Sequence, residues 1–405
     1  MLERITISFF GKTNAGKSSL INAVTGQDVS IVSEIPGTTT DPVKKVMELL
    51  PLGPVTLIDT PGLDDKSLLA EERIKKTERI LDSTQIAILV ADGREKNFSL
   101  EKELILKFNK KNIPFLFVVN KKDLIEEKND EGSAFFSLSE KPLFVSAKNK
   151  INIEELKKKL GELYTELSEK KEKKLLVRDL LDEREGQTVI LVIPIDQSAP
   201  KDRLILPQQM VLRELIGYGM IPLCSTPKNL PSALKSLSKA PSLVITDSQA
   251  FAQVSSLIMP EIPLTSFSIL MARYKGTLED SLLGSKALDS IKSGDKILIS
   301  EGCSHHRQCG DIGSVKLPAL IRSYSKVEPI FEFSSGATFP RDLSSYSLVI
   351  HCGGCMLNEN EMASRARLAK EGGIPFTNYG MAIAKMTGIL ERSLLPLKIS
   401  LGNEN

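Results

Sequence analysis

The feature that most constrains this chain is a glycine-rich loop that begins at Gly11. Residues 11–18 read Gly-Lys-Thr-Asn-Ala-Gly-Lys-Ser and follow directly on the apolar run 5–10. Between a strand and a helix, the glycines of such a loop let backbone N–H groups converge on phosphate oxygens. The pattern predicts Lys17 as the cation for the β- and γ-phosphates and the Ser18 hydroxyl as a ligand of Mg²⁺. The chain is therefore expected to open with a P-loop nucleotide domain.

Apolar runs that recur along the first part of the chain predict the sheet that carries this loop. They lie at residues 5–10, 55–59, 86–92, 114–120 and 142–147. Amphipathic stretches separate them, which is the pattern of a mostly parallel sheet with helices on both faces. The charged, helix-periodic run 153–184 predicts a closing helix and an exposed helical connector.

The length of 405 residues allows two or three domains, each with its own core. Strand-like runs return after Gly186, again separated by helical stretches. They lie at residues 188–195, 219–226, 242–248, 295–302, 328–336 and 347–355. We predict an α/β protein in which a P-loop domain (1–170) is followed by two smaller α/β domains (171–265 and 266–405).

Two further motifs follow the loop in the order that a nucleotide switch requires. Asp59-Thr60-Pro61-Gly62 ends a strand, so it places a carboxylate near the metal and the Gly62 N–H near a γ-phosphate. Upstream, residues 36–41 read Pro-Gly-Thr-Thr-Thr-Asp and offer hydroxyls on a loop that could close over Mg²⁺. The threonines by themselves are ambiguous.

The base is predicted to be guanine. Asn120-Lys121-Lys122-Asp123 follows a strand, and the Asp123 carboxylate can accept hydrogen bonds from guanine groups that adenine lacks. Ser146-Ala147-Lys148 follows the next strand and completes the base pocket. GTP is therefore the expected nucleotide. The residues predicted to contact it are Gly11, Asn14, Ala15, Gly16, Lys17, Ser18, Ser19, Asn120, Lys121, Asp123, Ser146, Ala147 and Lys148, and those assigned to catalysis are Lys17, Thr39, Asp59 and Gly62.

These motifs resemble the TrmE/Era-like GTPases, translation-factor-like enzymes related to tRNA-modifying and ribosome-assembly GTPases, in which a P-G-x-T-x-D switch loop is usual. The resemblance implies that Thr39 is the switch ligand of Mg²⁺. It also implies that Asn14 helps to hold a K⁺ ion that stands in for an arginine finger. Leu63 stands where Ras-like enzymes have the glutamine that orients water, so slow intrinsic hydrolysis is expected.

A second signal comes from cysteine and histidine. Four of the five cysteines fall between residues 303 and 355, and all three histidines lie in the same two clusters. Cys303-Ser304-His305-His306 and His351-Cys352-Gly353-Gly354-Cys355 each end a strand-like run, where open α/β sheets place their ligands. We therefore expect the two clusters to meet at one crevice.

The residue types suit either zinc or an iron–sulfur cluster, since small neighbours let backbone N–H groups reach sulfur. Three cysteines and one histidine would also make a structural zinc site. Cys309 is predicted to be a ligand, a thiol that supports the ligands or a structural residue, and Cys224 is predicted to belong to the core.

The combination of an N-terminal P-loop GTPase with Cys-x-His, a gap of about 45 residues and His-Cys-x-x-Cys resembles the FeFe-hydrogenase maturation GTPases, the HydF family, over the whole chain. The resemblance implies a 4Fe-4S cluster on Cys303, Cys352 and Cys355. It leaves the fourth iron open, weakly held or exchangeable, with His305, His306 and His351 as candidates.

The same resemblance implies a scaffold function. The protein would receive a dinuclear iron precursor that carries CO, cyanide and a dithiolate from two radical-SAM maturases, and pass it to the FeFe-hydrogenase. It would be a homodimer through its middle domain. GTP turnover would tune partner exchange.

Composition gives weaker evidence about partners and location than the motifs give about activity. With 53 basic and 51 acidic residues, the net charge of +2 gives no field for gripping nucleic acid, and none is expected as a partner. No apolar run is long enough to cross a bilayer and the first residues do not read as a signal peptide, so a cytoplasmic protein is predicted. The alternative is a ribosome- or RNA-associated GTPase with a structural zinc domain.

Overall fold

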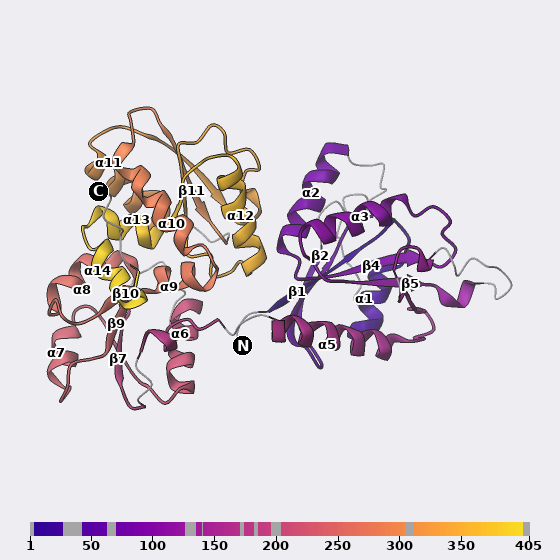
Figure 1. The fold of residues 1–405 in the computed structure, drawn as a ribbon, viewed down its shortest axis with the longest axis horizontal. Helices are drawn as coiled ribbons and strands as arrows, with labels where there is room; N and C mark the ends of the chain where they lie inside the picture. The colour runs from indigo at the N-terminus through magenta and orange to yellow at the C-terminus, as the bar shows by residue number, and fades with distance from the viewer. Residues whose placement is uncertain are drawn as a thin grey trace. The chain divides into compact units, whose positions relative to one another are not determined.

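The computed structural model describes nine stretches of the chain. They are residues 4–26, 43–62, 70–125, 135–139, 141–170, 174–181, 185–195, 204–303 and 311–399. The chain forms two compact units, Met1–Glu172 and Lys173–Asn405. Figure 1 shows both, and each is described by itself.

The first unit is built on a six-stranded sheet in the order β2-β3-β1-β4-β5-β6. Its strands are β1 (Ile5–Phe10), β2 (Val43–Leu49), β3 (Gly53–Asp59), β4 (Ile86–Asp92), β5 (Phe115–Asn120) and β6 (Leu143–Phe144). All pair in parallel except β2, which runs antiparallel to β3. The central strands β1 and β4 are buried on both faces, and most of their side chains are apolar.

Helices cover both faces of this sheet, as the alternating pattern predicted (Figure 1). They are α1 (Lys17–Thr25), α2 (Ala70–Ser83), α3 (Ser99–Lys110) and α5 (Ile153–Lys170). Leu20 of α1 and Leu156 of α5 belong to one core cluster. Leu81 of α2 and Phe108 of α3 belong to the cluster on the opposite face. The sheet therefore lies between two helical layers.

Strand β2 was not among the predicted strands. Its sequence, Val-Lys-Lys-Val-Met-Glu-Leu, mixes charged residues into an edge strand and lacks a regular alternation. Pairing with β3 in the register Val43↔Asp59 to Leu49↔Gly53 supplies the order that the sequence pattern does not show.

The second unit contains two four-stranded sheets, both wholly parallel. The first has the order β10-β9-β7-β8, from β7 (Thr188–Val192), β8 (Ile221–Ser225), β9 (Leu243–Thr246) and β10 (Leu264–Ser266). The second has the order β12-β11-β13-β14, from β11 (Lys296–Glu301), β12 (Ile330–Ser335), β13 (Leu348–His351) and β14 (Phe376–Asn378). In each sheet the chain places its second strand on one side of the first and its third strand on the other. The two sheets thus share one topology, which agrees with the recurrence of α/β units in the sequence.

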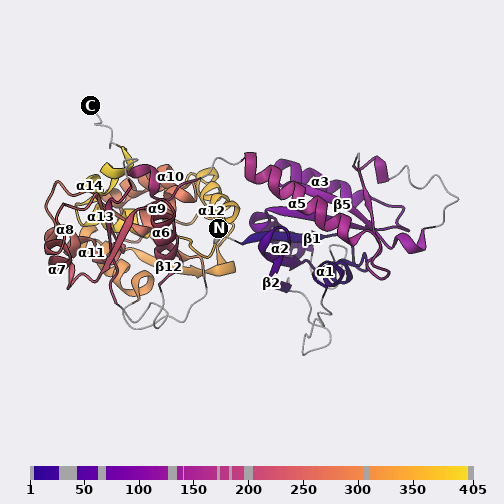
Figure 2. The ribbon, with the colours of Figure 1, turned by 90° about the horizontal axis from the view of Figure 1, so that it is seen from below.

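Helices surround both of these sheets (Figure 2). They are α6 (Leu206–Gly217), α7 (Leu230–Lys235), α8 (Phe251–Leu257), α9 (Phe267–Tyr274), α10 (Leu278–Ser285), α11 (Leu317–Ser325), α12 (Glu359–Glu371), α13 (Tyr379–Met386) and α14 (Leu390–Leu394). Helix α9 packs directly on α13, and Ile269 and Met381 share one core cluster with residues of the first sheet. Two helices from distant parts of the sequence therefore tie the sheets together.

Two features of this unit differ from the sequence prediction. The three-residue strands β10 and β14 are too short to give a periodic signal and were missed. Cys224 was predicted to be a core residue, which is wrong: it is exposed, and it lies on the edge strand β8. None of the helices among the described residues is both long and apolar enough to cross a membrane.

Candidate functional site

The glycine-rich loop joins β1 to α1, as predicted. Gly16 precedes α1 in a left-handed conformation with φ of 88°, and a Cβ added there would lie 2.3 Å from Asn120 Nδ2. Only glycine fits this position, because a side chain would be strained by the backbone and blocked by Asn120. The buried Lys17 ammonium donates to the carbonyl oxygens of Gly11 at 3.1 Å and Lys12 at 2.8 Å. The loop is thus closed around its lysine at the N-terminus of a helix.

The residues predicted to hold Mg²⁺ lie side by side. Ser18 Oγ donates a hydrogen bond to Asp59 Oδ2 at the end of β3. The other carboxylate oxygen, Asp59 Oδ1, is buried and makes no hydrogen bond among the described residues. Burial raises the pKa of Asp59, although Ser18 and Lys17 act to lower it. A hydroxyl beside a buried, half-satisfied carboxylate is a donor set that fits a hard divalent cation. Gly62 lies beside Thr13 of the loop.

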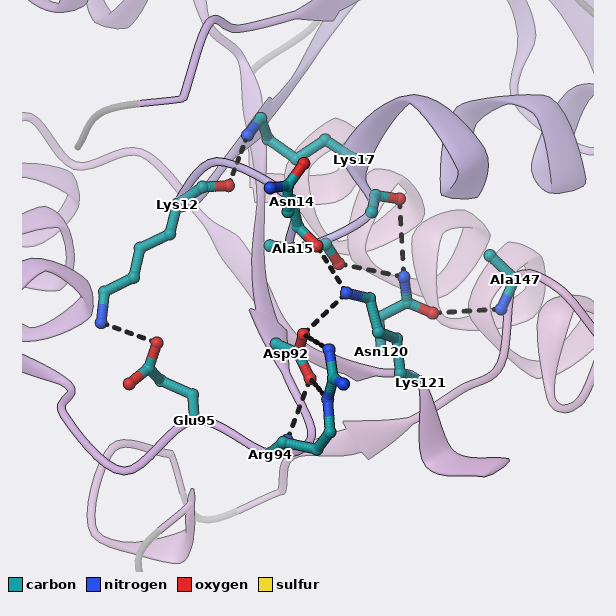
Figure 3. A network of polar contacts seen from close by, with 11 residues as sticks. Lys12, Asn14, Ala15, Lys17, Asp92, Arg94, Glu95, Asn120, Lys121 and Ala147 are labelled. Carbon is teal, nitrogen blue, oxygen red and sulfur yellow. Dashed lines mark hydrogen bonds and ion pairs between the residues drawn. The ribbon is translucent and has the colours of Figure 1, made fainter. Parts of the chain in front are cut away.

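Asn120 joins the three parts of the nucleotide site (Figure 3). Its Nδ2 donates to Ala15 O at 3.1 Å, and its Oδ1 accepts from Ala147 N at 3.0 Å. Lys121 Nζ donates to Asn14 O at 2.6 Å. The loops after β1, β5 and β6 are therefore linked by hydrogen bonds from side chains that are predicted to contact the nucleotide.

The remaining predicted nucleotide residues lie at the rim of this arrangement. Ser146 Oγ donates to Asp123 Oδ1 and accepts from Asn149 N at 3.1 Å. Ser146 is buried, whereas Ser19, Asp123 and Lys148 are exposed. Asp123 is thereby accessible to a base.

Sequence reasoning missed an ion-pair network beside the loop. Asp92, at the end of β4, accepts from Lys121 Nζ at 2.7 Å and from Arg94 Nη2 at 2.8 Å. Although partial burial acts to raise it, these hydrogen bonds hold the pKa of Asp92 well below its usual range. Lys12 Nζ pairs with Glu95 Oε2 at 2.9 Å (Figure 3). The available signal was the position of Asp92 at the end of an apolar strand.

Several predicted site residues lie outside the described part of the chain. They are Thr39 and the rest of residues 36–41, Leu63, His305, His306 and Cys309.

The two cysteine clusters meet, as predicted from their places after strands. β11 and β13 are neighbours, paired in parallel with Ser300 opposite His351. Cys303 follows β11 and Cys352 follows β13, at the point where the strand order reverses. Open parallel sheets bind ligands at this kind of switch point.

Backbone N–H groups are directed at one of the sulfur atoms. Gly302 N and Gly354 N donate to Cys352 Sγ at 3.1 and 3.4 Å. The two loops pack so closely that a Cβ added to Gly302 would lie 2.9 Å from Leu357 Cγ. Glycine at position 302 thus lets the loop after β11 approach the loop after β13.

The thiols lie in a low-dielectric environment. Burial raises the pKa of Cys352 to about 11 and that of Cys355 to about 11, and it raises the pKa of Cys303 as well. A charge on one thiol also acts to raise the pKa of another: Cys355 acts on Cys303, Cys303 on Cys352, and Cys352 on Cys355. Within the described residues, which stop at Cys303 and resume at Asp311, no three His, Cys, Asp or Glu side chains converge on a single metal ion.

His351 is held by protein groups on both ring nitrogens. Its Nδ1 lies 2.7 Å from Cys352 O and its Nε2 lies 2.9 Å from Arg365 Nη1. Since arginine can only donate and a carbonyl can only accept, the proton is on Nδ1. Burial, followed by Arg365, lowers the pKa of His351 to about 3. Both ring nitrogens of His351 are thus engaged by protein groups, and His351 remains a predicted candidate for the fourth ligand.

Two buried charged residues near the thiols were also missed by sequence reasoning. Glu301 ends β11 and is 5% exposed, and its charge raises the pKa of Cys303 after burial and Cys355. Lys275 follows α9 and is 2% exposed, and its Nζ donates to Leu357 O at 2.8 Å. Neither residue belongs to a motif, so only the fold brings them to the cysteines.

The fold and the first site define a P-loop GTPase domain joined to two parallel α/β domains. The family models agree with this division. Residues 6–121 match the 50S ribosome-binding GTPase model, residues 176–276 the hydrogen maturase F dimerization domain, and residues 279–396 the hydrogen maturase F tetramerization domain. The chain belongs to the hydrogen maturase F (HydF) family.

Several named GTPases and GTP-binding proteins are similar to part of the chain. A GTPase Der from Clostridium botulinum is 37% identical over 159 residues, which is 36% of each chain. A GTPase Der from Clostridium acetobutylicum is 33% identical over 42% of this chain and 41% of its own. The chain thus spans about a third to two-fifths of the length of these curated relatives. Among solved structures, a probable GTP-binding protein engB is 26% identical over 40% of this chain and 99% of its own, with a TM-score of 0.32.

Proposed function

We propose that this hydrogenase-maturation GTPase binds a 4Fe-4S cluster on Cys303, Cys352 and Cys355 and serves as the scaffold that carries a dinuclear iron precursor to an FeFe-hydrogenase. The observation that carries the proposal is the meeting of Cys303 and Cys352 at the switch point between β11 and β13. It occurs in a chain whose other unit is a GTPase domain.

The reaction in the first unit is hydrolysis of GTP to GDP and phosphate. The α1 N-terminus and Lys17 bind the phosphates, because the loop already directs an ammonium and backbone N–H groups to one place. Ser18 and Asp59 hold Mg²⁺, which neutralises charge on the phosphates. Asp123 reads guanine, while Asn120 keeps the base loop against the phosphate loop.

Switch closure is assigned to Gly62, which ends a described stretch, and to Thr39, which lies outside the described residues. Gly62 would contact the γ-phosphate, and Thr39 would complete the Mg²⁺ shell when the loop 36–41 closes. Asn14, whose carbonyl accepts from Lys121, is the residue assigned to K⁺. The proposed K⁺ ion would supply positive charge where other GTPases use an arginine.

The donor set in the second unit fits a cluster better than a single zinc ion. In a 4Fe-4S cluster each thiolate ligates a different iron, so the three sulfurs need not converge on one point. Two N–H donors on Cys352 Sγ are the kind of contact that stabilises a thiolate of such a cluster. When bound, the cluster would supply an exchangeable iron position to which an incoming metal unit can attach.

The partners follow from the family. Two radical-SAM maturases would supply the precursor, with its CO, cyanide and dithiolate ligands, and the FeFe-hydrogenase would receive it. Dimerization and tetramerization domains make up the second unit, so we expect at least a homodimer. We expect GTP turnover to bias switch loops and thereby partner exchange.

Anaerobic reconstitution with iron and sulfide tests the cluster. The reduced protein should give a 4Fe-4S electron paramagnetic resonance signal that is lost in Cys303→Ala, Cys352→Ala and Cys355→Ala. Cys224→Ala is the matched control, since this exposed cysteine lies on β8 and should leave the signal unchanged. Stoichiometric zinc without a cluster would instead favour the ribosome- or RNA-associated alternative.

A further inference from the structure

A buried cation lies against the loop that holds two of the three cysteines. Lys275 is among the largest side chains that are almost completely buried in the chain, with 2% exposure. Its Nζ donates to Leu357 O at 2.8 Å, two residues beyond Cys355. It also lies 5.6 Å from the centre of the Tyr274 ring. Burying an ammonium is costly, so this placement calls for compensating negative charge or dipoles nearby.

Cys355 packs against the core cluster that contains Leu270 and Met271 of α9, the helix that Lys275 follows. Lys275 belongs to the segment that matches the dimerization domain, whereas the three cysteines belong to the segment that matches the tetramerization domain. Gly353 lies against Met271 and Ser268 of α9, so the cysteine loop packs on the helix that Lys275 follows.

We propose that Lys275 is a positioning residue of the cluster site, which supplies a fixed positive charge that stabilises the negative charge of the thiolate-ligated cluster and holds the loop of Cys355 against α9. The inference rests on the proposed function. The reduced cluster carries one more negative charge than the oxidised cluster, since one electron enters from the chemical reductant. A nearby buried cation therefore favours the reduced form.

The neighbouring Lys174 provides a matched control. Its Nζ pairs with Glu359 Oε2 at 3.1 Å and its side chain is 42% exposed. It also lies near the end of α9, because its Nζ is 3.4 Å from Tyr274 O. Its charge is screened by water, whereas that of Lys275 is buried.

The test is an electron paramagnetic resonance redox titration of the reconstituted full-length chain with dithionite. Four variants are compared with the wild type: Lys275→Met, Lys275→Gln, Lys275→Arg and Lys174→Met. In Lys275→Met we expect wild-type iron and sulfide content but a roughly tenfold lower equilibrium constant for reduction, which is a shift of about 59 mV to more negative potential. Lys275→Gln keeps a neutral donor and should shift similarly, which separates charge from hydrogen bonding. Lys275→Arg and Lys174→Met should stay near the wild-type potential.

The outcomes are distinguishable. If Lys275→Met does not fold, as judged by thermal unfolding, Lys275→Gln carries the comparison. A shift that persists at high salt supports a buried charge. If Lys275→Met and Lys275→Gln both take up a normal cluster and its reduction potential equals that of the wild type, the role of Lys275 is overturned and the proposed function stands. A wild type that takes up no cluster would overturn both.

Discussion

The nucleotide site and the cysteine site use the same topological position with different chemistry. Both follow the first strand of a parallel sheet, the glycine-rich loop after β1 and Cys303 after β11, where neighbouring strands lie on opposite sides. The nucleotide site draws on backbone N–H groups and polar side chains from short motifs. The cysteine site also has charged residues around it that belong to no motif, such as Arg365 and the distant Lys275. A phosphate site can therefore be specified locally, whereas a buried thiolate site needs its surroundings.

The sharpest test of their independence is Lys17→Ala. GTP hydrolysis should fall by about a hundred- to thousandfold, because the phosphates lose a preorganised cation. The iron and sulfide content should be unchanged, since Lys17 lies in the phosphate loop of the first unit, whereas the three cysteines lie in the second unit. Steady-state phosphate release and metal analysis measure the two effects. A variant that also loses its cluster would show that the sites are coupled.

Cys352→Ser is the reciprocal change. We expect the reconstituted cluster to be lost, because Cys352 Sγ is the sulfur that receives N–H bonds from Gly302 and Gly354. GTP hydrolysis should remain within about twofold of the wild type. Iron analysis and phosphate release are the measurements, with Cys224→Ser as the control. Retained cluster content would remove Cys352 from the ligand set.

Gly302→Val tests whether the cysteine site depends on close packing. The added side chain would collide with Leu357, so the two loops must separate at an expected cost of about 1–3 kcal/mol in unfolding free energy, with weaker cluster retention. Chemical denaturation of the metal-free protein measures the cost. Gly353→Ala is the matched control, since an added Cβ there meets its first neighbour only at 3.8 Å. Equal effects of the two substitutions would argue against packing as the cause.

His351→Asn tests whether this histidine is structural. The change removes the ring nitrogen that accepts from Arg365 Nη1, while Arg365 Nη2 keeps Gly336 O and Glu361 Oε1 as acceptors. We expect about 1–3 kcal/mol of lost stability, measured by chemical denaturation. Cluster content and resonance line shape should be retained, because both histidine nitrogens are held by protein groups. The contrary result is a nitrogen coupling to the wild-type cluster that disappears in the variant.

Asp59→Asn is expected to have the smallest effect on stability. Because burial raises the pKa of Asp59, its ionised form is disfavoured in the folded, nucleotide-free protein. The variant should gain roughly 1 kcal/mol at neutral pH and lose the stabilisation that GTP with Mg²⁺ gives the wild type. The gain should shrink as the pH falls through the raised pKa toward the ordinary value of 3.8, since Asp59 then becomes protonated. Thermal unfolding across pH tests the gain in stability without nucleotide. The same measurement with GTP and Mg²⁺ tests the loss of stabilisation by the nucleotide.

The sequence by itself determined the P-loop domain, the parallel sheets and the meeting of the two cysteine clusters. Those features depend on short apolar runs and on glycine spacing, which act locally along the chain. The HydF assignment, made first from the motifs of both ends, is confirmed by the family models. The sequence did not show the edge strand β2 or the short strands β10 and β14, whose order comes from their pairing partners.

Only the tertiary structure decided which residues surround the thiols. In the folded chain Cys224 is exposed, and both ring nitrogens of His351 have hydrogen-bond partners. The ammonium of Lys275 contacts the loop of Cys355. None of these follows from residue type or spacing, because burial and charge proximity depend on contacts between distant segments, such as Lys275 and Leu357, which are 82 residues apart. Motifs identify the atoms that can bind a ligand, and the packing around those atoms determines their pKa values and their hydrogen bonds.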